Sequence, residues 1–108
     1  MEKIEKTLKY TKLFNLYGGL LSSAQQEVLR DYFFVDLSIS EISENRGISR
    51  AAVEDALSKG MSRLDSIEES LKMCEKHARI ADKTRELQEM IDDEKQLKIL
   101  DEILGDLF

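Results

Sequence analysis

The chain has 108 residues, with 16 Lys and Arg against 22 Asp and Glu, one Cys, one His and no Pro. This length supports one small domain, or a domain with an appendage, and a single Cys excludes an internal disulfide. One Cys and one His also exclude a structural zinc site. The polar N-terminus and the lack of a long apolar run predict a cytoplasmic protein that does not insert into membranes. The net charge of −6 argues against nucleic-acid binding over the whole surface.

The composition predicts an all-α protein with five or six helices, because helix formers are abundant, Pro is missing and β-branched runs are absent. The first helix is expected from about Glu2 to Tyr17, with Ile4, Leu8, Leu13 or Phe14, and Tyr17 at helical spacing. Gly18 and Gly19 are expected to end it, because Gly tolerates the left-handed conformation common at helix ends.

Three further helix starts follow from Ser residues in N-cap positions. Ser22 precedes Gln25 and Ser38 precedes Glu41 at the spacing of a capping box, and Ser49 follows Gly47 and Ile48. The inward positions of the helix after Ser22 are expected to be Val28, Leu29, Tyr32 and Phe33. The helix after Ser38 is short and ends near Asn45-Arg46-Gly47.

Residues 37–53 carry the pattern of a helix-turn-helix: a capped short helix, a turn with Gly47, and a second capped helix. Ile42 and Ile48 are expected to pack with Val53 and Leu57 and so to fix the angle between the two helices. Arg50 begins the second helix, where a recognition helix meets base edges or phosphates.

No strong helix-terminating signal appears for more than thirty residues after Ser49, which predicts a long helical arm. Its apolar and small residues follow steps of three and four, as in a heptad seam: Leu57, Gly60, Leu64, Ile67, Leu71, Cys74, Ala78 and Ala81. An amphipathic helix that begins near Asp92-Asp93-Glu94 follows. The seam is either packed within one chain, with the last helix folded back, or joins two chains. We favour a homodimer, because helix-turn-helix proteins frequently pair to match two half-sites.

Three segments resemble the DNA-reading helical region of bacterial sigma factors: residues 21–29 (LSSAQQEVL), 37–42 (LSISEI) and 48–53 (ISRAAV). With the stretch at residues 13–21 (LFNLYGGLL), the short length and the acidic residues 65–69, the chain resembles the YlxM family of small helix-turn-helix proteins of Firmicutes. This resemblance implies a sigma-like helix-turn-helix fold. It also implies an accessory or regulatory role beside the signal recognition particle, with the RNA of that particle as a possible ligand.

The candidate nucleic-acid contacts are basic or capping residues of the turn and the second helix: Arg46, Ser49, Arg50, Lys59 and Arg63. Arg50 is the base or phosphate contact, Lys59 and Arg63 are phosphate anchors, and Ser49 is the N-cap. The second helix departs from related helices at Ala51, Glu54 and Ser58, where those helices commonly carry Gln and aromatic or basic groups. The carboxylates of Glu54 and Asp55 could accept from a cytosine amino group but repel phosphates. A helix-turn-helix that has kept its shape and lost its ligand is therefore the alternative.

A second basic feature is a ridge at steps of four, three and four, formed by Lys72, Lys76, Arg79 and Lys83. These residues share one helix face and could follow phosphates. We favour the simpler interpretation of a solvated face whose cations pair with neighbouring glutamates. Cys74 is expected to be a small buried thiol on the seam.

We expect a domain at residues 1–64 and an acidic arm at residues 65–108, because the first 63 residues hold nine cations and nine anions and the rest hold seven and thirteen. The expected function is nucleic-acid binding, to DNA or structured RNA. The alternative is a protein-interaction module in which the arm docks onto a GTPase of the targeting machinery. No phosphate loop, nucleophile elbow or metal-ligand spacing is present, so we expect neither an enzyme nor a cofactor.

Overall fold

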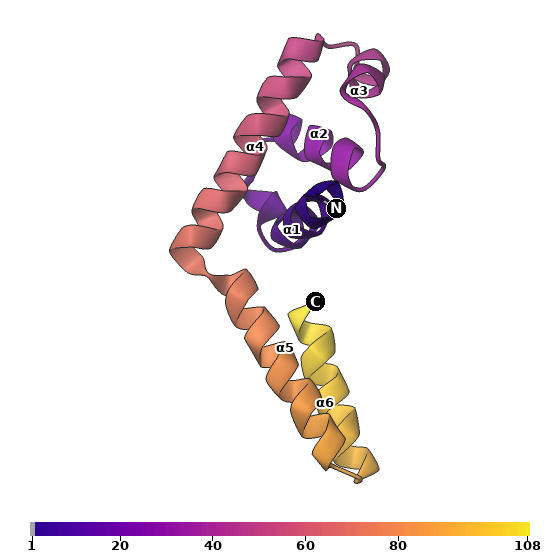
Figure 1. Cartoon of the computed structure of the whole chain (residues 1–108), viewed down its shortest axis with the longest axis vertical. Coiled ribbons are helices and arrows are strands. Elements are labelled where there is room, and N and C mark those ends of the chain that lie inside the picture. The colour runs from indigo at the N-terminus through magenta and orange to yellow at the C-terminus, as the bar shows by residue number, and fades with distance from the viewer. Residues whose placement is uncertain (1) are drawn as a thin grey trace. The chain divides into compact units, whose positions relative to one another are not determined.

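The computed structural model of the chain describes residues 2–108, and these residues form only helices and their connections. The elements are α1 (Glu2–Tyr17), η1 (Gly18–Leu20, a 3-10 helix), α2 (Ser23–Phe33), α3 (Ile39–Arg46), α4 (Arg50–Leu71), α5 (Met73–Met90) and α6 (Glu94–Leu107). They form two compact units, one ending at Leu71 and one spanning Lys72–Phe108 (Figure 1). The all-α prediction is confirmed.

Two helices begin with the predicted capping boxes. The Ser22 hydroxyl accepts from the Gln25 backbone N–H at 3.2 Å, and the Gln25 side chain accepts from the Ser22 N–H at 3.2 Å. Ser38 and Glu41 repeat this exchange at 3.1 Å in both directions. Each box satisfies N–H groups that have no partner inside the helix, so these starts are fixed by four consecutive residues.

The first helix, α1, ends at Tyr17 as predicted, but neither Gly18 nor Gly19 adopts the expected left-handed conformation. The chain tightens instead into the 3-10 helix η1, where Leu21 N–H donates to the Gly18 carbonyl at 3.1 Å. A Cβ on Gly18 would lie 3.1 Å from the Phe14 ring. The glycine therefore provides room for an aromatic side chain rather than a reversed backbone.

The buried face of α1 is also shifted from the expected one. Tyr10, Leu13, Phe14 and Tyr17 are buried, whereas Ile4 and Leu8 are exposed. The first two turns of α1 therefore contribute little to the core, and the aromatic second half anchors this helix.

The core of the first unit lies where α1, α2 and α3 meet one side of α4 (Figure 1). Leu29, Ile42, Val53 and Leu64 are fully buried there, and Leu57 is also buried. The burial of Ile42, Val53 and Leu57 agrees with the helix-turn-helix prediction. Ile48 is 39% exposed, so it is only partly covered, whereas Ile42 is fully buried. Ile48 lies in the turn between α3 and α4.

The expected uninterrupted helix after Ser49 is interrupted at Lys72. This residue is left-handed, with φ of 53°, and separates α4 from α5. No Pro or Gly marks the break, which explains why the sequence pattern did not predict it. The seam is consequently divided: Leu57, Gly60 and Leu64 are buried in the first unit, and Ala81 is buried in the second.

In the second unit, α6 folds back along α5 (Figure 1). This is the arrangement expected if the heptad seam packs within one chain. Ala81 and Thr84 of α5 and Leu100 of α6 are buried. The Asp93 carboxylate caps α6 by accepting from the Lys95 N–H at 3.3 Å, which confirms the predicted helix start.

Much of the apolar α6 face is exposed, including Ile99 and Ile103. Cys74 is half-buried rather than fully buried.

Candidate nucleic-acid interface

The helix-turn-helix is built from α3, a short turn and α4. Gly47 ends α3 with φ of 66°, a left-handed conformation that only Gly adopts without cost. The Ser43 hydroxyl donates to the Ile48 carbonyl, and the Ile48 N–H donates to the Ser43 carbonyl at 3.2 Å. The Ser49 hydroxyl accepts from the Ala52 N–H at 3.0 Å, so its predicted role as N-cap of α4 is confirmed.

Arg50 is the first residue of α4 and its side chain is exposed. It forms no ion pair with any residue that the structure describes, so its guanidinium is available to an outside ligand. The positive end of the helix dipole lies at the same position. An anion or a base edge that approaches this end of α4 would meet both.

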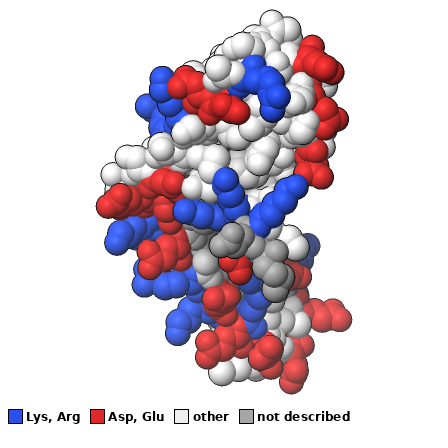
Figure 2. Space-filling view, turned by 45° about the horizontal axis from the view of Figure 1, so that its top comes forward, with Lys and Arg blue, Asp and Glu red and all other residues white. Residues whose placement is uncertain are grey.

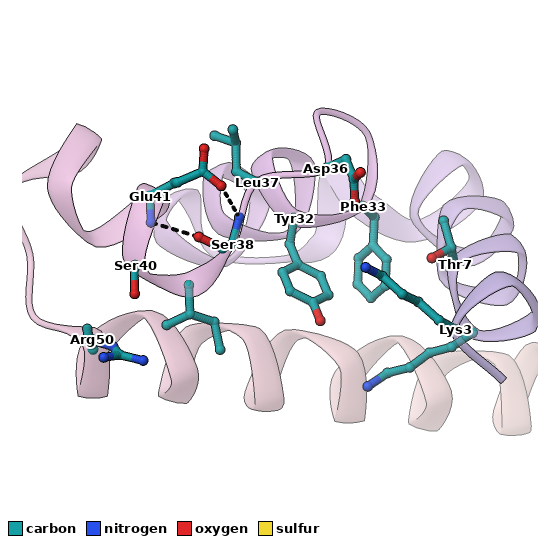
Figure 3. Close-up of a pocket in the computed structure, with 12 residues that line it drawn as sticks. Lys3, Thr7, Tyr32, Phe33, Asp36, Leu37, Ser38, Ser40, Glu41 and Arg50 are labelled. Carbon is teal, nitrogen blue, oxygen red and sulfur yellow. Dashed lines mark hydrogen bonds between the residues drawn. The ribbon is translucent and has the colours of Figure 1, made fainter.

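Arg50 lines a surface pocket of about 370 Å³ (Figure 3). The opposite wall comes from the first two turns of α1 and supplies two more cations, Lys3 and Lys6. Figure 3 shows the Lys3 ammonium and the Tyr32 hydroxyl both directed toward α4, with Ser40 beside Arg50. Cations from two helices therefore face one hollow.

The other polar groups of the pocket are mostly hydroxyls, from Thr7, Tyr32, Ser38 and Ser40. Two carboxylates, Asp36 and Glu41, also line it. Glu41 is committed to its capping box, and the hydrogen bond from the Ser38 backbone lowers the pKa of its carboxyl. Three cations and several hydroxyl donors suit an oxyanion such as a phosphate, since charge-assisted hydrogen bonds are the stronger kind.

Arg46 is held by two carboxylates of α2. Its Nε donates to Asp31 Oδ2 at 2.6 Å, its Nη2 donates to Asp31 Oδ1 at 3.1 Å, and its Nη1 lies 3.1 Å from Glu27. The bond to Asp31 raises the pKa of the Arg46 guanidinium above its ordinary value. A phosphate would have to compete with this bidentate pair, so Arg46 serves first to fasten α3 to α2.

The two expected phosphate anchors of α4 lie outside the pocket. The Lys59 ammonium is 3.2 Å from Asp55, one helix turn away, and both side chains are exposed. Arg63 is exposed and has no ion pair with a described residue. On the face that Figure 2 shows, basic and acidic side chains are interspersed. Two of the predicted cations, Arg46 and Lys59, lie beside carboxylates that offset their charge.

The predicted basic ridge is divided by the helix break. Lys72 is the left-handed residue before α5, whereas Lys76, Arg79 and Lys83 border an apolar groove between α5 and α6. All three of these cations are exposed, as expected for a solvated face, and they lie beside apolar side chains of the groove.

Lys3 and Lys6 are the site residues that sequence reasoning missed. They are three residues apart in α1, so they share a helix face, and this spacing was the available signal. What the sequence could not provide was the packing of α1 beside the helix-turn-helix. Within the part of the chain that the structure describes, no three potential metal ligands gather, and no helix is long and apolar enough to span a membrane.

Comparisons with known proteins support the resemblance noted in the sequence. Residues 4–103 match the UPF0122 family, whose description is "Putative helix-turn-helix protein, YlxM / p13 like". A UPF0122 protein of Fusobacterium nucleatum is 33% identical over 101 residues, which cover 94% of this chain and 98% of the relative. UPF0122 proteins of a Thermoanaerobacter species and of Mycoplasma capricolum are each 35% identical, over 104 and 102 residues.

These alignments cover 90% and 94% of this chain and 89% and 90% of the respective relatives, so the similarity extends over nearly whole proteins. No solved structure matches the chain significantly. With the helix-turn-helix geometry in place and a family match over most of its length, the chain belongs to the UPF0122 family of YlxM/p13-like proteins.

Proposed function

We propose that this protein binds nucleic acid through the N-terminal turn of α4 and the pocket beside it. The observation that carries the proposal is the exposed, unpaired Arg50 at the start of the second helix of a helix-turn-helix, opposite Lys3 and Lys6. In proteins of this architecture, the start of the second helix contacts base edges while neighbouring cations contact phosphates.

Each residue has a distinct role in this proposal. Arg50 contacts a base edge or a phosphate. The Ser49 cap fixes the start of α4 and so the position of Arg50. Lys3 and Lys6 neutralise phosphates from the side of α1. Arg63, and Lys59 once it leaves Asp55, anchor the backbone further along α4.

Glu54 limits what the helix can contact. It is exposed one turn after Arg50, and a carboxylate repels phosphates but accepts a hydrogen bond from a cytosine amino group. Because the positive groups are few and interspersed with acids, we expect modest affinity with a strong dependence on salt.

The test is a titration of the full chain with duplex DNA and with structured RNA at several salt concentrations. We expect Arg50→Ala to weaken binding at least about fivefold, which corresponds to the roughly 1 kcal/mol lower bound for a specific Arg contact. Lys3→Ala and Lys6→Ala should each lower the slope of log affinity against log salt by about 1.

Arg85→Ala is the matched control, because Arg85 is an exposed helical arginine of the second unit that pairs only weakly, at 3.7 Å, with Asp82. It should leave binding unchanged. If neither nucleic acid binds at low salt, or if Arg50→Ala and Arg85→Ala behave alike, the proposal is wrong.

For the ligand, we propose the RNA of the signal recognition particle, which the resemblance to the YlxM family implies. The test compares this RNA with an unrelated structured RNA of equal length under the same salt conditions. A preference that disappears in Arg50→Ala supports the assignment, and equal affinity for the two RNAs contradicts it.

A further inference from the structure

The second unit carries an apolar groove with a basic border. The groove has a volume of about 550 Å³ and lies between α5 and α6. Ile80 and Leu87 of α5 are 46% and 45% exposed, and Ile103 of α6 is 38% exposed. Large apolar side chains gathered on one surface commonly mark an interface.

The α5 margin of this groove is basic. Lys76, Arg79 and Lys83 line it beside Ile80 and Leu87. No ion pair joins Arg79 or Lys83 to a carboxylate among the residues that the structure describes. Whatever covers the apolar groove would therefore meet uncompensated positive charge along this side.

The α6 margin is acidic at the corresponding height. At 100° per residue, Glu102 and Asp106 lie on the side of α6 that continues outward from Ile99 and Ile103, and both are exposed. The groove therefore has an apolar centre, with cations along its α5 margin and anions along its α6 margin.

The charges also match in their distance from the connection between the two helices. Counted from the end of α5 at Met90 and the start of α6 at Glu94, Lys83 and Glu102 lie seven and eight residues away. Arg79 and Asp106 lie eleven and twelve residues away. A two-fold axis parallel to the helices would place the basic α5 margin of one copy against the acidic α6 margin of the other, at the same height. The surface is therefore complementary to a second copy of itself.

We propose that a second copy of this chain covers the groove, so that two α5–α6 hairpins form a four-helix bundle. In this dimer α5 lies antiparallel to α6 of the partner subunit. Arg79 then faces Asp106 of the partner subunit, and Lys83 faces Glu102 of the partner subunit. Ile80, Leu87 and Ile103 meet their counterparts at the centre. The inference does not depend on the nucleic-acid contact proposed above.

Sedimentation of the full chain over a range of concentrations tests the assembly. We expect a reversible change from the 12.4 kDa monomer to twice that mass. Ile80→Asp should abolish the dimer without changing the helical circular dichroism, because this side chain is half exposed in the monomer. Leu8→Asp, at an exposed apolar position of α1, should leave the dimer intact.

Charge reversal identifies the partner. The variant with Arg79→Glu and Lys83→Glu should raise the dimer dissociation constant at least about tenfold, because each altered pair occurs twice in a symmetric dimer. Adding Glu102→Lys and Asp106→Lys should restore it. A chain that is monomeric at every concentration, or a fourfold variant that remains as weak as the double variant, overturns the proposal; in the latter case the groove accepts a different, acidic partner.

Discussion

The hydroxyl of Tyr10 donates a 2.8 Å hydrogen bond to the carboxylate of Asp65, joining α1 to α4 across 55 positions of sequence. Asp65 also lies 3.1 Å from the Lys9 ammonium, and the Tyr17 hydroxyl donates to Glu68 at 2.6 Å. Two acidic residues of α4 thus hold the aromatic face of α1. The part of α4 after residue 64 therefore belongs structurally to the first unit, which ends at Leu71.

Tyr10→Phe should lower the free energy of unfolding by about 1 kcal/mol, the usual net value of an intramolecular hydrogen bond. The ring would still stack on Phe33, at 5.5 Å between centroids, so the loss reports the hydroxyl alone. Urea denaturation measures it. Tyr32→Phe is the control, because the Tyr32 hydroxyl lines the open pocket and makes no hydrogen bond with a described residue.

Alkaline pH provides a second test of the same bond. Burial, and then the hydrogen bond to Asp65, raise the pKa of the Tyr10 phenol above its ordinary 10.0. The folded state therefore holds this proton more tightly than the unfolded chain, and the stability that it contributes is lost as pH rises above 10.0. The stability of Tyr10→Phe should fall less over this range, and parallel curves for the two proteins would contradict the assignment.

Gly60→Ala should destabilise the first unit by about 1–3 kcal/mol, the usual cost of overpacking. The added Cβ would lie 2.6 Å from Leu29 Cδ1, and Leu29 is fully buried, so it has no free space to enter. Gly105→Ala is the matched control in α6, where the Cβ meets nothing within 4 Å. It should raise helix stability by up to about 1 kcal/mol. Thermal unfolding that shifts equally in both variants would refute the close approach of α2 and α4.

Gly47→Ala should cost about 1–2 kcal/mol, because its φ of 66° is left-handed and disfavours any Cβ. The space around Gly47 is open, so the penalty comes from the backbone and not from a clash. Gly19→Ala has equally open surroundings and no positive φ, and should lose no stability. Chemical denaturation of the two variants separates these effects, and equal losses would rule out the left-handed turn.

Glu41→Gln should remove part of the acid sensitivity of the first unit. The Ser38 backbone lowers the pKa of the Glu41 carboxyl below its ordinary 4.5, so its contribution is present above 4.5 and is lost as pH falls through the lower, folded value. The amide retains the capping acceptor without titrating. Unfolding curves of the wild type and the variant should therefore converge in acid, whereas Glu44→Gln, at an exposed position that caps nothing, should show no such convergence.

The helix starts could be predicted from the sequence because their causes are local. Ser22 with Gln25, Ser38 with Glu41, and Ser49 each satisfy backbone groups within three residues. The break at Lys72 could not be predicted, since no residue there favours a left-handed backbone. The left-handed backbone at Lys72 therefore has no signal among the neighbouring residues of the sequence.

The candidate site could be predicted only where it depends on position in the motif. Arg50 was identified because the helix-turn-helix pattern fixes the start of α4. The neighbouring Lys3 and Lys6, and the pairing of Arg46 with Asp31, depend on how α1 and α2 pack beside that motif. Charge alone did not distinguish the bound Arg46 from the unpaired Arg50.

The local caps at Ser22, Ser38 and Ser49 have a kinetic consequence. Each helix of the first unit after α1 has its start encoded by neighbouring residues, so these segments can form before any distant contact is made. Contacts such as the bond between Tyr10 and Asp65, 55 positions apart, require in contrast that distant segments meet first. The position of Arg50 at the start of α4 therefore depends on a local cap, whereas the placement of Lys3 and Lys6 beside it depends on the packing of α1.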